Sequence, residues 1–215
     1  MRLTIVFDNT IFNKDIGLKS GWGFSCLVET KTDTILFDTG EDGNVLLKNM
    51  EILEINPKKI SKIVISHEHY DHNGGLDSLL SILDKSEVYR VKNFESTKNV
   101  HFIFSEKNRQ ITEDIYTTGR LEGSVDEQSL ILQGNKGWYL IVGCSHPGVG
   151  RIFDVAKFYG DIVGVIGGLH GFNDYSLFEN LELICATHCT QHKKEIYRLF
   201  PNTTIEGGVG QIIDI

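Results

Sequence analysis

Short apolar runs, rich in β-branched and aromatic residues, recur along nearly the whole chain. Runs of about four to eight such residues, bounded by polar or glycine-rich turns, predict β-strands. We expect strands at residues 1–8, 24–29, 34–38, 60–65, 88–91, 115–118, 128–132, 138–142, 161–170, 181–187 and 203–215. Glycines interrupt the last of these strands, so it is expected to break.

A second pattern, in which apolar residues stand three or four positions apart, fills several of the segments between strands. This spacing places apolar side chains on one face of a helix. It predicts helices at residues 43–54, 76–83, 152–158 and 191–200. Strands and helices therefore mix along the chain, and the expected fold class is α/β.

The segment from residue 86 to residue 114 shows the weakest pattern. After the strand at 88–91, single aromatic residues are scattered among polar ones. Residues 85–114 carry six Lys and Arg against five Asp and Glu, a local balance of +1. Two interpretations stay open: a loop-rich insertion that forms one wall of a substrate pocket, or an ordinary solvated segment.

The composition is that of a globular protein. A chain of 215 residues with 40% hydrophobic content can bury a sizeable core, and we expect one domain over residues 1–215. A formal net charge of −8 argues against non-specific binding of nucleic acid or anionic membranes. No apolar run reaches membrane-spanning length, and the apolar part of residues 1–8 is too short for a signal peptide.

The number and placement of the cysteines indicate the redox conditions in which the protein folds. Four cysteines in a chain of this length do not make a disulfide framework, so we expect a reducing, cytoplasmic setting. Three of the four lie in apolar, strand-like runs, where a small buried hydrophobe is the plain interpretation. The four are Cys26, Cys144, Cys185 and Cys189.

One turn concentrates the candidate chemistry. His67, His69, Asp71 and His72 fall within six residues, directly after the strand at 60–65 and before a helix. Imidazole and carboxylate groups suit Zn²⁺ and similar metals. The alternative, a polar surface turn that happens to be rich in histidine, does not explain so dense a cluster of ligand-type side chains.

The pattern His67-x-His69-x-Asp71-His72 resembles the signature of the metallo-β-lactamase superfamily. That resemblance implies an αββα four-layer sandwich, with two packed sheets and helices outside. It also implies two divalent metal ions, zinc in the first place and manganese or iron as alternatives. Asp38, in a strand-ending Asp-x-Gly, would support the site from behind the ligands, although a turn or capping aspartate is the alternative.

The resemblance extends along most of the chain and assigns the ligands. His67, His69 and His146 would hold the first metal, and Asp71, His72 and His188 the second. Within the superfamily the chain is similar to the branch of 7,8-dihydropterin-6-yl-methyl-4-(β-D-ribofuranosyl)aminobenzene-5′-phosphate synthases. Matching segments include residues 36–40, 143–148, 167–170 and 187–190.

Two of these ligands have competing interpretations. His146, at a strand end, can equally be a capping or merely polar turn histidine. His188 stands with Cys185, Cys189 and His192 at positions that would share one face of a helix, as in a structural zinc cluster. The strand pattern of residues 181–186 argues against that helix.

His170 departs from the family pattern. It ends a buried, glycine-flanked strand where the superfamily usually has a metal-bridging aspartate, and the next carboxylate is Asp174. Four roles stay open for His170: a metal ligand, a bystander to a metal pair bridged by solvent alone, a substrate-contacting acid–base group, or a structural histidine.

The resemblance implies metal-assisted hydrolysis. Asp71 is expected to be catalytic, by orienting the water or accepting its proton, and His170 is a catalytic candidate through its place at the strand end. The expected substrate is an anionic small molecule, either a phosphorylated pterin-like compound or a phosphodiester. A lactone or thioester hydrolase and a non-catalytic metal-binding module are the alternatives. A redox di-iron enzyme fits less well, because its usual signature carries a carboxylate where this chain has His69.

Overall fold

The computed structural model describes residues 1–12 and 14–215. Its strands form two sheets, and the first runs in the order β13-β1-β2-β3-β4-β5-β6. The strands of this first sheet are β1 (Arg2–Phe7), β2 (Ser25–Glu29), β3 (Thr34–Phe37), β4 (Lys62–Val64), β5 (Ser86–Arg90), β6 (Val100–Phe104) and β13 (Ile212–Asp214).

The second sheet runs in the order β12-β11-β10-β9-β8-β7. Its strands are β7 (Arg109–Thr112), β8 (Ile115–Thr117), β9 (Leu130–Gln133), β10 (Trp138–Val142), β11 (Ile162–Gly168) and β12 (Leu183–Thr187). The chain thus completes most of one sheet before it builds the other, and returns to the first sheet only with β13.

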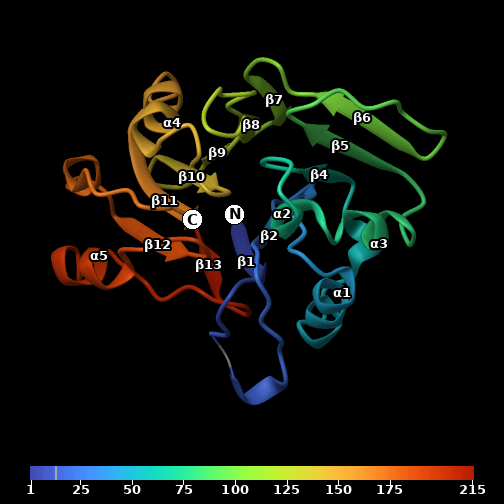
Figure 1. The fold of residues 1–215 in the computed structure, drawn as a ribbon, viewed down its shortest axis with the longest axis horizontal. Helices are drawn as coiled ribbons and strands as arrows, with labels where there is room; N and C mark the ends of the chain where they lie inside the picture. Colours follow the sequence, from blue (N-terminus) through green and yellow to red (C-terminus); the bar gives the residue numbers. More distant parts are fainter. Residues whose placement is uncertain (13) are drawn as a thin grey trace.

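Helices cover the outer face of each sheet. In Figure 1, α1 (Gly43–Ile52) and α3 (Leu76–Leu80) lie on one side of the molecule, and α4 (Val149–Ala156) and α5 (Lys193–Leu199) on the other. Met50 of α1 packs in one apolar cluster with Leu36 and Ile63, while Phe153 of α4 packs in another with Leu140. The predicted αββα four-layer sandwich is confirmed.

The period of two along each strand explains how both faces of a sheet are filled. In β3, Ile35 and Phe37 belong to the cluster between the sheets, whereas Leu36 belongs to the cluster under α1. Successive side chains of a strand point to opposite faces, so a strand covered on both sides must be apolar throughout.

The segment 86–114 is not a loop-rich insertion, so that interpretation was wrong. It contains β5 and β6, which end the first sheet, and β7, which begins the edge of the second. The weak pattern has a physical cause: every residue of β6 is partly or fully exposed, as expected for an edge strand.

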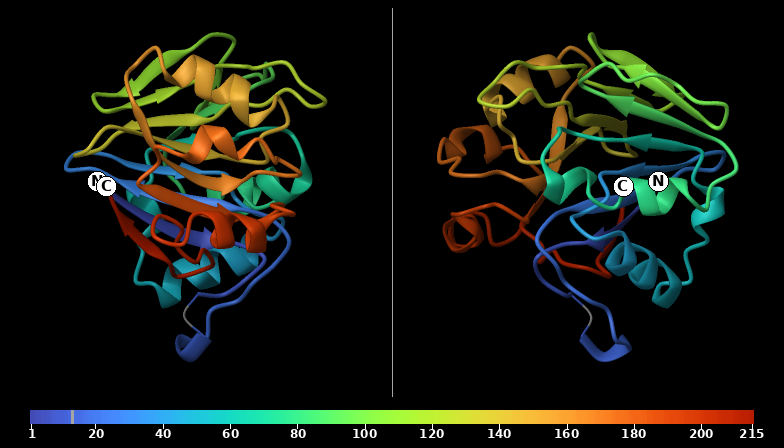
Figure 2. Two further views of the ribbon diagram at one scale, coloured as in Figure 1. Left: turned by 90° about the vertical axis from the view of Figure 1, so that its left-hand side faces the viewer. Right: turned by 45° about the vertical axis from the view of Figure 1, so that its right-hand side comes forward.

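The two ends of the chain meet. β13 pairs antiparallel with β1, and the N-terminal amino group donates to the Ile215 carbonyl at 3.0 Å. Both termini lie together in the two views of Figure 2. Within the described residues, the helices are too short and too polar for any of them to cross a bilayer.

Strand direction sets the place of the site. β3 pairs parallel with β4, and β10, β11 and β12 are parallel to one another. The carboxyl ends of parallel strands meet at one edge of a sheet, so the turns that follow these strands lie close together. α2 (Tyr70–Asn73) and the turn before it occupy that edge.

Candidate metal centre

Three imidazoles gather at the carboxyl ends of β4 and β10. The ring centroids of His67 and His69 lie 4.6 Å apart, and that of His146 lies 4.8 Å from His67 and 5.0 Å from His69. The three rings stand at 75° to 88° to one another, so they face a shared point edge-on rather than stack. This is the donor set predicted for the first metal.

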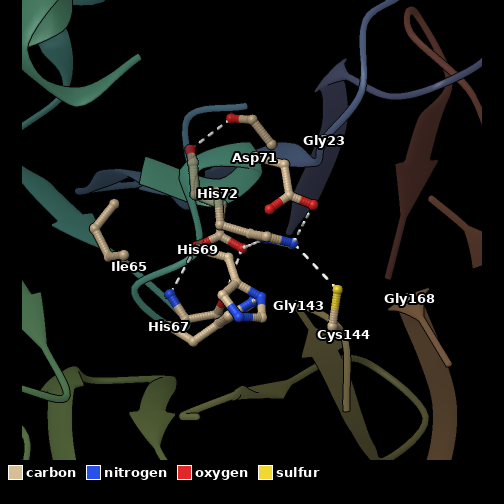
Figure 3. A network of polar contacts seen from close by, with 12 residues as sticks. Gly23, Ile65, His67, His69, Asp71, His72, Gly143, Cys144 and Gly168 are labelled. Carbon is tan, nitrogen blue, oxygen red and sulfur yellow. Dashed lines mark hydrogen bonds and ion pairs between the residues drawn. The ribbon is translucent and has the colours of Figure 1, made fainter. Parts of the chain in front are cut away.

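A second donor set adjoins the first. Asp71 Oδ2 lies 3.2 Å from His188 Nε2 and 3.7 Å from His72 Nε2. The ring centroids of His67 and His72 are 4.2 Å apart, so the two sets share a boundary. Figure 3 shows His67, His69, Asp71 and His72 leaving one turn and converging toward the β10 end.

Neighbouring polar groups fix the orientation of three imidazoles. In each, Nδ1 is held by an oxygen outside the donor set, which leaves Nε2 to face the site. The pairs are His67 with Ser66 Oγ at 2.9 Å, His72 with Asp38 Oδ2 at 2.7 Å, and His188 with Asn9 Oδ1 at 2.9 Å. Such partners set ring orientation and tautomer in metal sites.

Asp38 is fully buried and does more than contact His72. Its Oδ1 accepts from the Ser66 backbone N–H at 2.6 Å, and its Oδ2 accepts from the Ser66 hydroxyl at 2.7 Å. It therefore ties the end of β3 to the start of the ligand turn and does not itself enter the donor set.

Glu127 was missed by the sequence reasoning. Its buried Oε1 accepts the backbone N–H groups of residues 143, 144 and 145 at 2.9 to 3.1 Å, and its Oε2 accepts that of His146 at 2.8 Å. One carboxylate thus pins the whole turn that carries His146. Burial raises the pKa of Glu127, against the lowering effect of these N–H donors. Nothing in the sequence distinguishes it from a surface glutamate.

Four site residues have strained backbones. Asp38, Ser145, His170 and His188 have φ values of 57°, 61°, 46° and 44°. Positive φ is uncommon for residues other than glycine and costs free energy, so it persists where the surroundings enforce it. Each of the four directly follows a strand or lies in the turn after it. The strain is therefore concentrated where the ligand turns leave the sheets.

Charge in the site favours a cation. Burial and the neighbouring imidazoles lower the pKa of His67, and burial with the His170 and His69 rings lowers that of His146 to about 4. Burial tends to raise the pKa of Asp71, but the His188 imidazole at 3.2 Å and the charge of His72 outweigh it and bring the pKa to about 2. At neutral pH these groups are unprotonated donors, the form that metals bind.

These residues fit a metal pair. The Nε2 atoms of His146 and His188 are buried and have no hydrogen-bond partner, although Asp71 Oδ2 is only 3.2 Å from the second. Two ligands of one tetrahedral zinc, each about 2.0–2.2 Å from the ion, lie about 3.3–3.6 Å apart. If the lone pairs of Asp71 Oδ2 and His188 Nε2 point at one metal position, and not at each other, both the 3.2 Å spacing and the missing hydrogen bond are explained.

The structure excludes the alternative zinc cluster around His188. Cys185 lies on β12, a strand, and its fully buried side chain belongs to the apolar cluster between the sheets. His188 instead faces Asp71 and His72 at the edge of the sandwich. The helix that would have aligned Cys185 with His188 does not form.

His170 lies beside the first donor set. Its ring centroid is 4.7 Å from that of His146, and the residue is partly exposed. Asp174, the nearest later carboxylate, is exposed and accepts from the Ser176 hydroxyl at 2.7 Å. His170 thus lies next to a predicted ligand of the first metal, and its role stays a prediction.

Cys144 is a second residue that the sequence reasoning missed. Its thiol is buried, and its Sγ lies 3.2 Å from His72 Nε2. The hydrogen bond to Cys189 and burial raise the pKa of the Cys144 thiol when no metal is bound. Its place two residues before His146 was a signal that could have been used.

The chain is similar in sequence to known proteins. A sequence model of the metallo-beta-lactamase superfamily matches residues 23–155. An uncharacterized protein of Methanocaldococcus jannaschii is 29% identical over 264 aligned positions, covering 99% of this chain and 100% of the relative. The 7,8-dihydropterin-6-methyl-4-(beta-D-ribofuranosyl)-aminobenzene-5′-phosphate synthase of the same organism is 28% identical over 243 positions, covering 80% and 82%.

A solved structure agrees with these relatives. The crystal structure of a metal-dependent hydrolase of the beta-lactamase superfamily has a TM-score of 0.82 and 25% sequence identity, covering 100% of this chain and 99% of that one. The resemblance to the superfamily, and within it to the synthase branch, is confirmed. The chain belongs to the metallo-beta-lactamase superfamily.

Proposed function

We propose that the protein is a metal-dependent hydrolase that uses two divalent cations on a phosphorylated small molecule. The observation that carries this proposal is the pair of adjoining donor sets, with the His67 and His72 ring centroids 4.2 Å apart. A metal pair a few ångströms apart acidifies water and stabilises charge that develops on oxygen. Zinc is the cation we favour, because imidazole-rich sites suit it.

The candidate ligands fall into two sets, one for each cation. His67, His69 and His146 hold one cation, and Asp71, His72 and His188 hold the other. The Asp71 side chain is only 19% exposed, and its pKa of about 2 keeps it ionised at neutral pH. We assign Asp71 two roles: it binds metal, and it orients the nucleophilic water or accepts its proton.

An exposed aromatic side chain supports a substrate with a flat ring. Trp22 is 56% exposed, and its ring centroid lies 5.2 Å from that of His188. Its backbone N–H is anchored by Glu41 Oε1 at 2.7 Å, so the indole is held at the rim of the site. The name of the 28% identical relative, a synthase of a phosphorylated pterin compound, agrees with a ring-bearing, phosphorylated substrate.

The Gly148 turn is a poor candidate for binding the substrate phosphate. Its N–H already donates to the Ser145 carbonyl at 2.9 Å. We place the phosphate toward the metal pair instead, where the positive charge is greatest.

The compartment is part of the proposal. All four cysteines are free. We propose a cytoplasmic location, since reduced thiols beside a metal site are preserved where the surroundings are reducing.

The first prediction is metal content. We expect the gently purified protein to carry about two transition-metal ions per chain and, so loaded, to hydrolyse a phosphodiester or a phosphorylated pterin faster than lactones or thioesters. Elemental analysis, together with a panel of these substrate classes, measures both. One ion or none, with no rebinding, would contradict the two-metal proposal, and metal without turnover on any substrate would leave a binding module.

The second prediction concerns Trp22. Replacing Trp22 with alanine should raise KM for a ring-bearing substrate by about 2–10-fold and leave kcat nearly unchanged, because aromatic pairs contribute about 0.5–1.5 kcal/mol. Trp22→Phe should retain most of the affinity. The matched control is Phe158→Ala, since Phe158 is 86% exposed and contacts no site residue that the structure describes. Equal KM values for Trp22→Ala and Phe158→Ala would remove Trp22 from the substrate site.

A further inference from the structure

Cys144 stands between the two donor sets. Its Sγ lies within 4.8 Å of the ligand atoms of His67 and His146, and equally within 4.8 Å of those of His72 and His188. Three groups of potential metal-binding side chains occur among the described residues, and Cys144 belongs to all three, including the third with His170 and Cys189. In Figure 3 the thiol projects from the end of β10 toward the His72 ring.

The position of this thiol is fixed by the backbone. The Cys144 N–H donates to the buried Glu127 Oε1 at 2.9 Å, within the same set of bonds that holds the His146 turn. The residue is 2% exposed. The sulfur is therefore presented by the same rigid turn as a predicted metal ligand, and solvent does not compete for it.

The contact with His72 brings this sulfur next to a predicted metal ligand. Sγ and Nε2 are hydrogen-bonded at 3.2 Å, and a small separation would bring them to the distance of about 3.6 Å expected for a nitrogen and a sulfur on one tetrahedral zinc. Thiolate sulfur is also among the preferred ligands of zinc.

The usual source of a bridging ligand is missing. His170 occupies that position, and a neutral imidazole does not bridge two ions as a carboxylate does. Asp174 is exposed and its carboxylate accepts a hydrogen bond from the Ser176 hydroxyl, so we do not assign it as the bridging ligand. Among the described residues, the side chain that belongs to the groups around both donor sets offers a sulfur and not a carboxylate oxygen.

We propose that the Cys144 thiolate is a shared ligand of both metal ions and takes the place of the bridging carboxylate. As the sulfur–metal bonds form, the S–H bond breaks and its proton passes to solvent, since a coordinated thiol is deprotonated. This inference rests on the two-metal proposal above and adds one ligand to it.

Cobalt(II) titration of the metal-free, full-length protein tests the inference without any enzyme assay. Thiolate bound to cobalt gives a near-ultraviolet charge-transfer band that imidazole and carboxylate ligands do not give. We expect this band to appear with the first equivalent of cobalt and to change again with the second, because one sulfur contacts both ions. A band complete after one equivalent, with the second ion bound but silent, would overturn the shared role.

Substitutions identify the sulfur. Cys144→Ala and Cys144→Ser should both lose the band and bind cobalt more weakly at both sites, by at least about 100-fold at one of them, since losing even an outer partner of a ligand costs about 10–100-fold. Cys189→Ser is the matched control, because Cys189 lies within 4.8 Å of Cys144 and His170 but joins neither donor set. Loss of the band in Cys189→Ser alone would assign the sulfur to Cys189 and overturn the proposal.

The outcomes separate the two proposals. Failure of the wild-type protein to bind two cobalt ions would refute the two-metal site itself. Two bound ions with no charge-transfer band would leave that site standing and refute only the role of Cys144. Because the wild-type titration needs no variant, a variant that fails to fold does not spoil the test.

Discussion

Replacing Asp71 with alanine is expected to lower kcat/KM by at least about 10³-fold and to empty mainly the second metal site. The change removes a ligand and a proton acceptor together, and loss of an acid–base group alone costs about 10²–10⁴-fold. Asp71 Oδ2 is within 3.7 Å of both His72 and His188 Nε2, so its loss disrupts one donor set and leaves the other in place. The fold should survive, because the side chain stands on the short helix α2 and belongs to none of the apolar clusters.

Metal analysis and steady-state kinetics on the same preparations measure this effect. His146→Ala should empty mainly the first site instead, and the contrast between the two variants establishes the assignment. Asp77→Ala is the matched control, since Asp77 is an exposed aspartate six residues along the chain, on α3. Near-full activity in Asp71→Ala would show that the mechanism proposed above is wrong.

The candidate ligands were predictable because they are local in sequence. His67, His69, Asp71 and His72 occupy one turn, and the apolar strand before it places that turn at a sheet edge. The family resemblance then supplied the sandwich and the remaining ligands. Strand periodicity alone would not have brought His146 and His188 to the same edge, because that depends on the parallel pairing of β10, β11 and β12.

The supporting residues were not predictable in the same way. Glu127 acts through four backbone N–H groups of a turn that begins 16 residues later, and Asn9 holds a histidine 179 residues away. Contacts of this kind follow from strand register, which no single segment encodes. Cys144 was overlooked for another reason: an apolar strand run makes a buried cysteine look like packing, and only its distance to His72 reveals a ligand.

The edge strand β6 illustrates the limit of the apolar pattern. Strands covered on both faces, such as β11, are buried at every position and are easily recognised. β6 is paired with a neighbouring strand on one edge only, and all its side chains are partly or fully exposed, so its short apolar run between polar residues gives a weaker signal. The same exposure that hides an edge strand from sequence analysis also leaves its unpaired edge open to solvent.

The position of His170 favours an acid–base role over the other roles considered for it. It follows β11 with φ of 46°, and its carbonyl accepts from the Gln191 N–H at 2.9 Å, so the backbone is held in an unfavourable conformation. Asp38 and Ser145, which are outside the donor sets, have the same kind of backbone strain, so the strain alone does not assign a role to His170. Its ring packs against His146 at the partly exposed rim, where a substrate oxygen would approach.

His170→Ala should therefore lower kcat by about 10²–10⁴-fold, the range for a lost general acid or base, while the metal content stays at the wild-type value. Parallel measurements of turnover and bound metal distinguish the possible roles, with His101→Ala as a matched control because His101 is an exposed histidine on β6. Loss of one metal ion would make His170 a ligand. Unchanged turnover and unchanged metal would leave His170 structural.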